Sequence, residues 1–375
     1  MPGARTWRWV RVFPIRCPRG ATTQRPVRAV ATGNPMQSVP IRSWSRSSTA
    51  ASEARGPQRQ AWLDRVKSRR QELERNLDWL LESGDGQRAL RFASAMNVFW
   101  TAFGELSRAR ERLDTVLALP SAKAPTPARA RALYEAGLLA FRQNDEADSF
   151  ARNEQSLAIG RQLGDKTIIA RALIGLSRVA LRQHDYELVR RDANEALHLA
   201  GQLNDRDREL SAVHMLAAAA RMGEDNSNAA KYYELTLGAY GEEGDRAGVA
   251  GELMNLGFVH LHLHDSDWAL RLFEESVAIY RSLQLEQGLG WNIGGLAAVA
   301  VEQHDGLRAA RLYGALDAAM KKFAIVLDPD DQLDCDRYVA IARIEIGSTA
   351  FDAARAEGRQ MNISDALALG LRKPE

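Results

Sequence analysis

The feature that most constrains this chain is a 40-residue repeat that continues without insertion through most of its length. An acidic residue recurs at that interval, at Glu105, Asp145, Asp185, Asp225, Asp265 and Asp305. Three further series keep the same period: Asp165, Asp205 and Asp245; Leu117, Leu157, Leu197, Leu237 and Val277; Gly137, Ser177, Ala217, Gly257 and Ala297. Independent series that share one period of 20–50 residues indicate an array of stacked structural units.

Each unit has the pattern of a helical hairpin. The segments between short Gly, Asn or Asp breaks are rich in Ala, Leu, Arg and Glu, which favour helix. In one unit we expect a first helix at 252–262, a turn in which Asp and Ser cap the next helix, and a second helix at 268–283. One hairpin cannot bury its apolar face alone. The sequence therefore predicts an all-α, right-handed α-solenoid of about six hairpins with a C-terminal helical cap and a concave surface.

The same unit carries a family resemblance. Its runs Asn255-Leu256-Gly257-Phe258, Asp267-Trp268-Ala269 and Leu272-Phe273-Glu274-Glu275-Ser276-Val277 resemble the tetratricopeptide repeat (TPR). That motif has Leu-Gly in its first helix, an acid–aromatic pair before an Ala in the second, and a later aromatic with a small residue. The period of this chain is longer than that of the basic motif, and the longer period resembles the variant repeats of bacterial regulators.

Two flanking segments extend the resemblance to about residues 60–371. Asn76-Leu77-Asp78-Trp79-Leu80-Leu81-Glu82 looks like the start of the helical-repeat region in LuxR-type and SARP-type signal-transduction ATPase regulators, and Ala309-Ala310-Arg311-Leu312-Tyr313-Gly314-Ala315 is similar to their closing repeat. Those regulators carry an ATPase domain and an output domain. The sequence contains no Gly-x-x-x-x-Gly-Lys-Ser/Thr phosphate loop. The resemblance therefore implies the sensor and scaffold arm without the ATPase and DNA-binding domains.

Charge and composition divide the chain into three predicted domains: an arm at 1–57, a repeat domain at 58–320 and capping helices at 321–375. Residues 1–55 contain ten arginines and one acid, whereas the whole chain has a net charge of only +2. Without an apolar period, such a segment favours disorder. Contact with nucleic acid or anionic lipid through Arg and Trp side chains, and a targeting peptide, remain alternatives for the arm.

Three groups of side chains invite a chemical role, and each has a structural interpretation that we prefer. His260, His262 and His264 could bind a metal. However, His184 and His304 occupy the position of His264 in other repeats, so we expect these histidines to have a structural role in the repeat. The acidic stretch at 328–336 lacks the ligand order of a calcium loop, so we expect a solvated turn that starts a helix. Cys335 has no histidine near it in sequence to activate it. We therefore predict no metal, no cofactor and no enzymatic activity.

The concave surface is the better candidate site. In this repeat class the first helix of each hairpin lines the groove. Projecting the non-core positions of those helices places six arginines and a tyrosine in the earlier units and two apolar residues in the later ones. Guanidinium groups pair bidentately with carboxylates or phosphates. The predicted groove residues are Arg131, Tyr134, Arg142, Arg171, Arg178, Arg182, Arg221, Met254 and Phe258.

These observations predict a non-enzymatic scaffold that binds a protein or an acidic peptide in its groove and takes part in transcriptional regulation. The resemblance implies an ATPase or DNA-binding regulator subunit as the partner. The alternative is a regulator that contacts DNA directly through the basic arm. Only two cysteines occur, which favours a reducing cytoplasm, and no apolar run is long enough to cross a membrane.

Overall fold

The computed structural model describes residues 59–323, 327 and 329–372. These residues belong to one compact unit, 42–375; the other unit, 1–41, lies outside the described residues, as does the predicted disordered arm. None of the described helices combines the length and apolar character that crossing a membrane requires.

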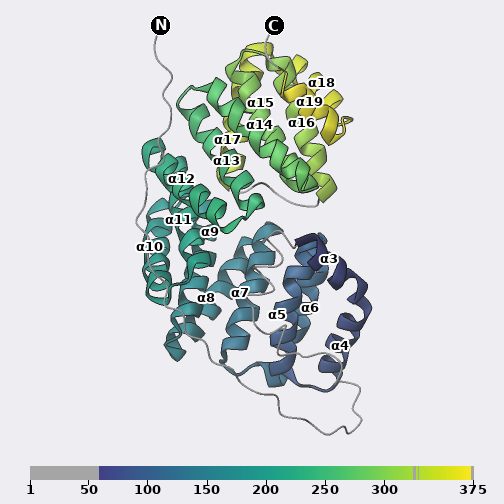
Figure 1. Ribbon diagram of the computed structural model, residues 1–375, viewed down its shortest axis with the longest axis vertical. Coiled ribbons are helices and arrows are strands. Elements are labelled where there is room, and N and C mark those ends of the chain that lie inside the picture. The colour runs from purple at the N-terminus through teal and green to yellow at the C-terminus, as the bar shows by residue number, and fades with distance from the viewer. Residues whose placement is uncertain (1–58, 324–326, 328, 373–375) are drawn as a thin grey trace. The chain divides into compact units, whose positions relative to one another are not determined.

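The described part of the chain is all-helical, as the repeat predicted, and contains no strand (Figure 1). It has seventeen α-helices and one short 3-10 helix, η2 (Pro120–Ala122). The α-helices are α3 (Arg59–Ser68), α4 (Arg70–Glu82), α5 (Gly86–Ala102), α6 (Leu106–Ala118), α7 (Pro127–Arg142), α8 (Glu146–Leu163), α9 (Lys166–Arg182), α10 (Tyr186–Leu203), α11 (Arg206–Met222), α12 (Asn226–Glu243), α13 (Arg246–His262), α14 (Ser266–Ser282), α15 (Glu286–Glu302), α16 (Gly306–Phe323), α17 (Pro329–Ile346), α18 (Ser348–Gly358) and α19 (Ile363–Gly370).

Six helical hairpins form the body of the fold: α5/α6, α7/α8, α9/α10, α11/α12, α13/α14 and α15/α16. Among the first helices of the hairpins, α5 contacts α7, α7 contacts α9 and α9 contacts α11, and α13 contacts α15. These helices form a layer. Contact between α11 and α13 is sparse. Helix α17 does not extend the array as another first helix; it contacts α9, α11, α15 and α16. This position of α17 is not a property of the repeat.

The turns explain why the period is so strict. A left-handed residue ends one helix and an aspartate begins the next, twice in each repeat through much of the array. Asn144, His184, Asn204 and His264 all have φ between 52° and 64°. The left-handed conformation stops a helix and satisfies its last carbonyls. The carboxylate that follows then accepts a backbone N–H bond; Asp265, for example, accepts from the Trp268 amide at 3.1 Å, as the sequence predicted. The αL position of His264 and its counterparts gives these histidines a role in the turn.

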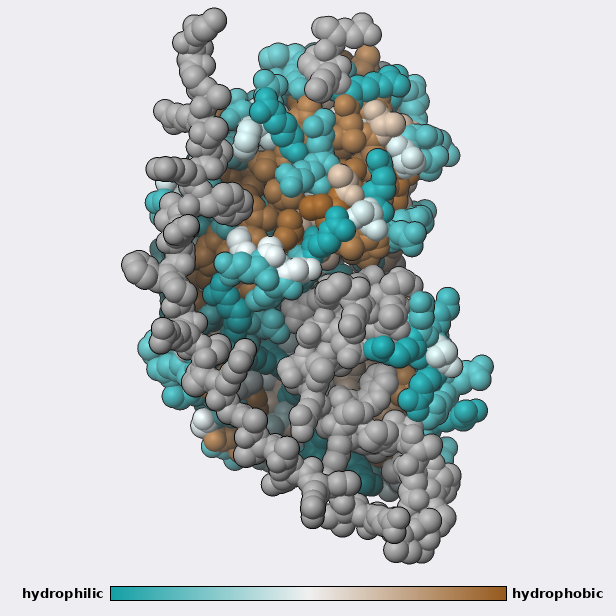
Figure 2. Space-filling model, viewed as in Figure 1, coloured by the Kyte–Doolittle hydropathy of each residue, from teal (hydrophilic) through white to brown (hydrophobic). Residues whose placement is uncertain are grey.

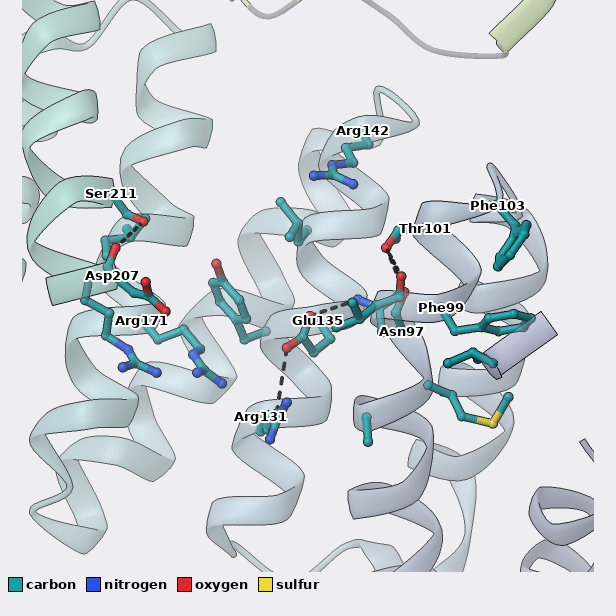
Figure 3. A pocket seen from close by; sticks show the side chains of 18 of the residues that line it. Asn97, Phe99, Thr101, Phe103, Arg131, Glu135, Arg142, Arg171, Asp207 and Ser211 are labelled. Carbon is teal, nitrogen blue, oxygen red and sulfur yellow. Dashed lines mark hydrogen bonds and ion pairs between the residues drawn. The ribbon is translucent and has the colours of Figure 1, made fainter. Parts of the chain in front are cut away.

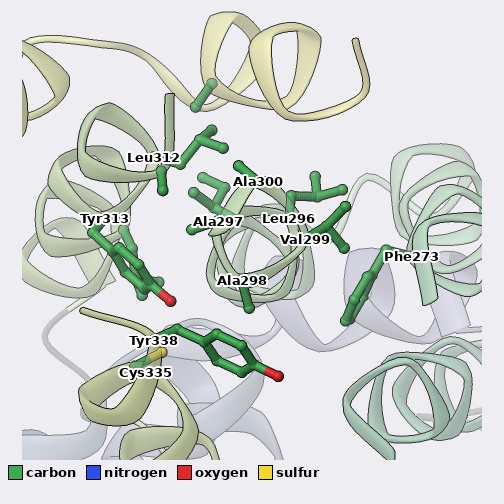
Figure 4. Packing of buried hydrophobic residues seen from close by; sticks show 14 of the residues in the cluster. Phe273, Leu296, Ala297, Ala298, Val299, Ala300, Leu312, Tyr313, Cys335 and Tyr338 are labelled. Carbon is green, nitrogen blue, oxygen red and sulfur yellow. The ribbon is translucent and has the colours of Figure 1, made fainter. Parts of the chain in front are cut away.

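Two glycines let the second helix α14 pack closely between two first helices. Phe273 of α14 is fully buried and lies between α13 and α15 (Figure 4). A Cβ atom at Gly257 would stand 2.7 Å from its Cζ, and a Cβ at Gly295 would overlap the same ring from the other side. No real Cβ occupies such space, so the ring fits only because both residues are glycine. In this unit the small residue of the series, Gly257, therefore marks a close contact between one helix backbone and a buried ring of the other helix.

The N-terminal helices are fastened by one buried carboxylate. Glu74 of α4 accepts from Trp100 Nε1 at 3.1 Å and from Arg112 Nη2 at 3.0 Å, and lies 3.2 Å from Arg108 Nε. Burial alone would raise its pKa, but these three donors outweigh burial and hold the pKa of Glu74 below its ordinary 4.5. The carboxylate thus joins α4 to the first hairpin in its ionised form.

Hydrophobic residues gather on the surface of the C-terminal helices (Figure 2), where the largest apolar cluster of the described residues also lies. Figure 4 shows its centre: α15 packs through Val299 toward Phe273, through Ala297 toward α16, and through Ala298 toward Tyr338 of α17, and the Leu296 side chain lies against Gly370 of α19. The closing helices therefore share a core with the last hairpins.

Candidate functional site

A buried charge cluster joins α17 to the first-helix layer. The Arg221 side chain on α11 is completely inaccessible to solvent. Its Nη2 lies 2.7 Å from Asp331 Oδ1 and 3.2 Å from Asp330 Oδ2, and its Nε lies 3.3 Å from Asp334 Oδ2. Burial alone would lower the pKa of Arg221, but the three carboxylates raise it well above its ordinary value. The guanidinium is therefore permanently charged and compensated by α17.

The prediction of a solvated turn at the acidic stretch is wrong. Asp330, Asp331 and Asp334 are at most 8% exposed, because they begin α17 and face Arg221. Asp334 Oδ1 also lies 2.6 Å from His262 Nε2 of α13. The carboxylates thus bridge α11 and α13, whose direct contact is sparse, and three acids in the first turns suit the positive end of the helix dipole.

The expectation that Arg221, Met254 and Phe258 face an open groove needs correction. Arg221 is covered by the α17 carboxylates, and Met254 and Phe258 are 6% and 2% exposed within the C-terminal apolar cluster. The Phe258 ring packs against the ring of Phe273, with centroids 5.4 Å apart, and against the Arg221 guanidinium, 5.0 Å from its centroid. These three residues stabilise the packed interior.

A large cavity of about 1310 Å³ lies along the earlier first helices. Four of the predicted groove residues, Arg131, Tyr134, Arg142 and Arg171, line it together (Figure 3). They come from α7 and α9, and α5, α11 and the residues that start α15 supply other parts of the wall. The strict period thus brings the side chains of successive units into one concavity, as a solenoid requires.

Three arginines in this cavity crowd one another. Burial, together with the charge of Arg171, lowers the pKa of Arg131. Burial and the charges of Arg171 and Arg131 lower the pKa of Arg208, on α11, to about 10. Like charges in a partly desolvated site raise each other's free energy, so these groups favour an anion between them. Arg208 is a site residue that the sequence interpretation missed.

Acids lie around these arginines as well: the charge of Asp165 acts on Arg208, and Asp207 and Glu286 line the same cavity. Arg131 Nε stands 3.8 Å from Glu135 Oε1, and Glu135 itself accepts from Asn97 Nδ2 at 2.8 Å. Arg208 pairs with Asp205, the residue that also caps α11. Arg171 forms no hydrogen bond or ion pair within the described residues; its guanidinium lies 5.4 Å from the Tyr134 ring centroid.

The remaining two predicted arginines lie beside a second cavity or against the fold itself. Arg178 lines a cavity of about 280 Å³ that shares Ser211 with the large one, so the concavity continues along the layer. Its Nη1 donates to Tyr134 Oη at 3.2 Å. The Arg182 guanidinium stacks 3.9 Å from the Phe141 ring centroid and donates to the Phe141 carbonyl at 3.0 Å. Arg182 therefore fastens one hairpin to the preceding one.

The groups considered for chemistry lie in structural settings. No group of three or more His, Cys, Asp or Glu side chains in the described ranges could hold a metal ion. Burial, with the negative charges of Asp331 and Asp334, raises the pKa of the Cys335 thiol well above its ordinary value. A thiol in that setting stays protonated and is a poor nucleophile.

The comparisons with known proteins support the fold. A Rap protein complexed with Competence and Sporulation Factor superposes with a TM-score of 0.57 at 16% identity over 88% of both chains. The apo form of RapI gives a TM-score of 0.45 at 13% identity over 84% of both chains. A putative kinesin light chain of Podosopora anserina with TPR-like repeats gives 0.42 at 15% identity, over 53% of this chain and 97% of the other. No family model and no curated protein sequence matches. The fold is thus a TPR-like α-solenoid.

Proposed function

We propose that this chain is a non-enzymatic interaction scaffold that binds a protein or an acidic peptide along its first-helix layer. The observation that carries the proposal is the cavity in which Arg131, Arg171 and Arg208 converge from three successive hairpins. Repeat solenoids use such concave surfaces for binding. The Rap protein of similar fold was solved with Competence and Sporulation Factor, which supports a protein or peptide ligand here.

The likeness of the repeats to LuxR-type and SARP-type regulators supports a role in transcriptional regulation. In that setting the scaffold would act in the cytoplasm, and the partner would be an ATPase or DNA-binding regulator subunit. A repeat array transmits binding well because each unit contacts chiefly its neighbours, so a bound partner changes the stacking of several units together. The arginines would then select the partner, and α17 would keep α11 and α13 together as the layer responds.

The test is capture of partners by the tagged full chain in its native host. Arg131→Glu with Arg171→Glu replaces two positive charges of the cavity by negative ones. The matched control, Arg190→Glu with Arg281→Glu, makes the same charge change on the second helices α10 and α14. We expect the control to retain the captured proteins and the cavity variant to lose at least one specifically. Identical sets of proteins from both variants, with unchanged helical circular dichroism, would contradict the proposal.

A further inference from the structure

The first-helix layer has one junction at which successive first helices barely touch. Contact between α11 and α13 is sparse, whereas the first helices of the other neighbouring hairpins contact each other directly. Polar side chains cross the junction: His214 Nδ1 lies 3.2 Å from Glu252 Oε1. Arg221 Nη1 also donates to Asn255 Oδ1 at 3.4 Å. The junction divides the described helices into an N-terminal body, α3–α12, and a C-terminal body, α13–α19.

The apolar contact across this junction is small. The buried hydrophobic cluster that spans α11, α12 and α13 has six members, and three of them are alanines: Ala217, Ala220, Ala229, Tyr233, Leu256 and Val259. The buried residues of α15 and α16 belong to another cluster, as do those of α9 and α10. Hydrophobic stabilisation grows with the apolar area that is removed from water, so a small cluster of short side chains contributes little of it.

Helix α17 bridges the two bodies. One face of it belongs to the C-terminal body, because Cys335 and Tyr338 lie in the C-terminal apolar cluster. The other face meets the N-terminal body through charged groups: the α17 carboxylates surround Arg221, and Arg337 Nη2 donates to Glu224 Oε1 at 3.1 Å. Helix α17 is therefore part of the C-terminal body, and ion pairs join it to α11 and the turn that follows.

An ionic bridge suits a joint that can open. A buried ion pair gains little net free energy, because its partners lose their hydration on burial and regain it on separation. Empty space also lies along the joint. A third cavity, of about 190 Å³, is lined by Arg221 and Glu224 of one body and Leu333 of the other, and the cavity of about 280 Å³ has walls from α9 and from α13. Loose packing of this kind leaves few van der Waals contacts to lose on opening.

We infer that the junction between α12 and α13 is a hinge, and that α17 is the latch that holds the two bodies in the closed arrangement. The large cavity has walls from both bodies, since Gln284, Leu285 and Phe323 line it together with residues of α7 and α9. A rotation about the hinge therefore changes the width of the candidate binding site. The inference concerns a motion of the chain alone, so it does not depend on what the cavity binds.

Distances between spin labels on the full chain, measured by double electron–electron resonance, test the hinge. Gln155 of α8 and Ala356 of α18 are exposed and lie in different bodies, so labelled cysteines at these two positions report the arrangement of the bodies. Labelled cysteines at Gln155 and at the exposed Arg91 of α5 report the N-terminal body alone. Cys17→Ser removes one native thiol, and the buried Cys335 stays unlabelled.

Arg221→Met removes the cation that the α17 carboxylates surround, and their mutual repulsion should open the latch. We expect the distance between the bodies to shift, or its distribution to broaden, by about 5 Å or more, the pitch of one helical turn. The distance within the N-terminal body should stay unchanged. Arg112→Met is the matched control, because Arg112 pairs with Glu74 and Asp78 inside the N-terminal body, and it should leave the distance between the bodies unchanged.

Adding Asp330→Asn, Asp331→Asn and Asp334→Asn to Arg221→Met removes the repulsion and should restore the wild-type distribution. Should Arg221→Met lose its helical circular dichroism, Asp334→Asn alone takes its place, because it weakens the contacts of α17 with Arg221 and with His262 and keeps the side-chain shape. The inference is overturned if the distribution between the bodies matches that of the wild-type chain, if Arg112→Met changes it equally, or if both label pairs change together, as unfolding would make them.

Discussion

Replacing Arg221 by methionine should destabilise the fold strongly, and the structure gives the magnitude. The variant keeps an apolar side chain of similar length but removes the guanidinium that Asp330, Asp331 and Asp334 face in the interior. Removing one partner of a buried ion pair costs about 3–5 kcal/mol, because the remaining charge is uncompensated. With three carboxylates at the site, we expect the upper part of that range.

Equilibrium unfolding in urea, followed by circular dichroism, measures this cost, and hydrogen exchange locates it. We expect the largest loss of protection in α17, since its carboxylates hold it against α11. A second variant separates charge from packing: combining Arg221→Met with Asp330→Asn, Asp331→Asn and Asp334→Asn removes the unpaired charges and should recover at least half of the loss. A cost below about 1 kcal/mol for Arg221→Met alone would refute the assignment of α17 as a charge-locked helix.

Gly257→Leu should cost about 3 kcal/mol or more in urea unfolding, because its Cβ would meet the Phe273 ring, whereas Gly238→Leu, with nothing within 4 Å of the added Cβ, should be neutral or stabilising. The pKa of Glu74 is lowered in the fold, so its stabilisation should be present above about pH 4.5 and fall away below it; melting curves of Glu74→Gln should lose that dependence. Arg182→Ala should lower the free energy of unfolding by about 1–2 kcal/mol, because its hydrogen bonds and its stacking on Phe141 are lost. A smaller effect in urea unfolding would show that Arg182 does not hold the two hairpins together.

The sequence predicted the repeat architecture because each unit is determined locally. Aspartates that cap helices and left-handed residues that end them act within a few positions of one another, so they leave a strict period. Gly257 carried a similar signal, since its contact lies within one hairpin. The helix bounds followed from these markers: the predicted second helix at 268–283 is α14, which begins two residues earlier and ends one residue earlier.

The place of α17 was not predictable in the same way. Arg221 and Asp331 are 110 residues apart, and the contact occurs once, so no period reports it. In the repeat, Arg221 stands at the position that Phe141, Leu181, Leu261 and Val301 occupy in other units, and all four are buried. The repeat therefore indicated that Arg221 is buried but not what pairs with it, and the acidic stretch has the features of a solvated helix start. Only the three-dimensional path of the chain brings these charges together and buries them.

The candidate site was predictable where it follows the repeat. Arg131 and Arg171 occupy the same position in successive repeats and lie in the same cavity. Arg208 was missed because the equivalent position in the next repeat is Ser211, and Arg208 reaches the cavity from about one turn nearer the start of α11. Departures from strict periodicity therefore contribute to the site as much as the repeat does.

The central claim is that the first-helix layer is the binding surface, and hydrogen exchange of the full chain with and without its captured partner tests it most directly. We predict partner-dependent protection in α7, α9 and α11, with little change in the second helices α8, α10 and α12. Protection confined to the second helices, with none in α7, α9 or α11, would contradict the account.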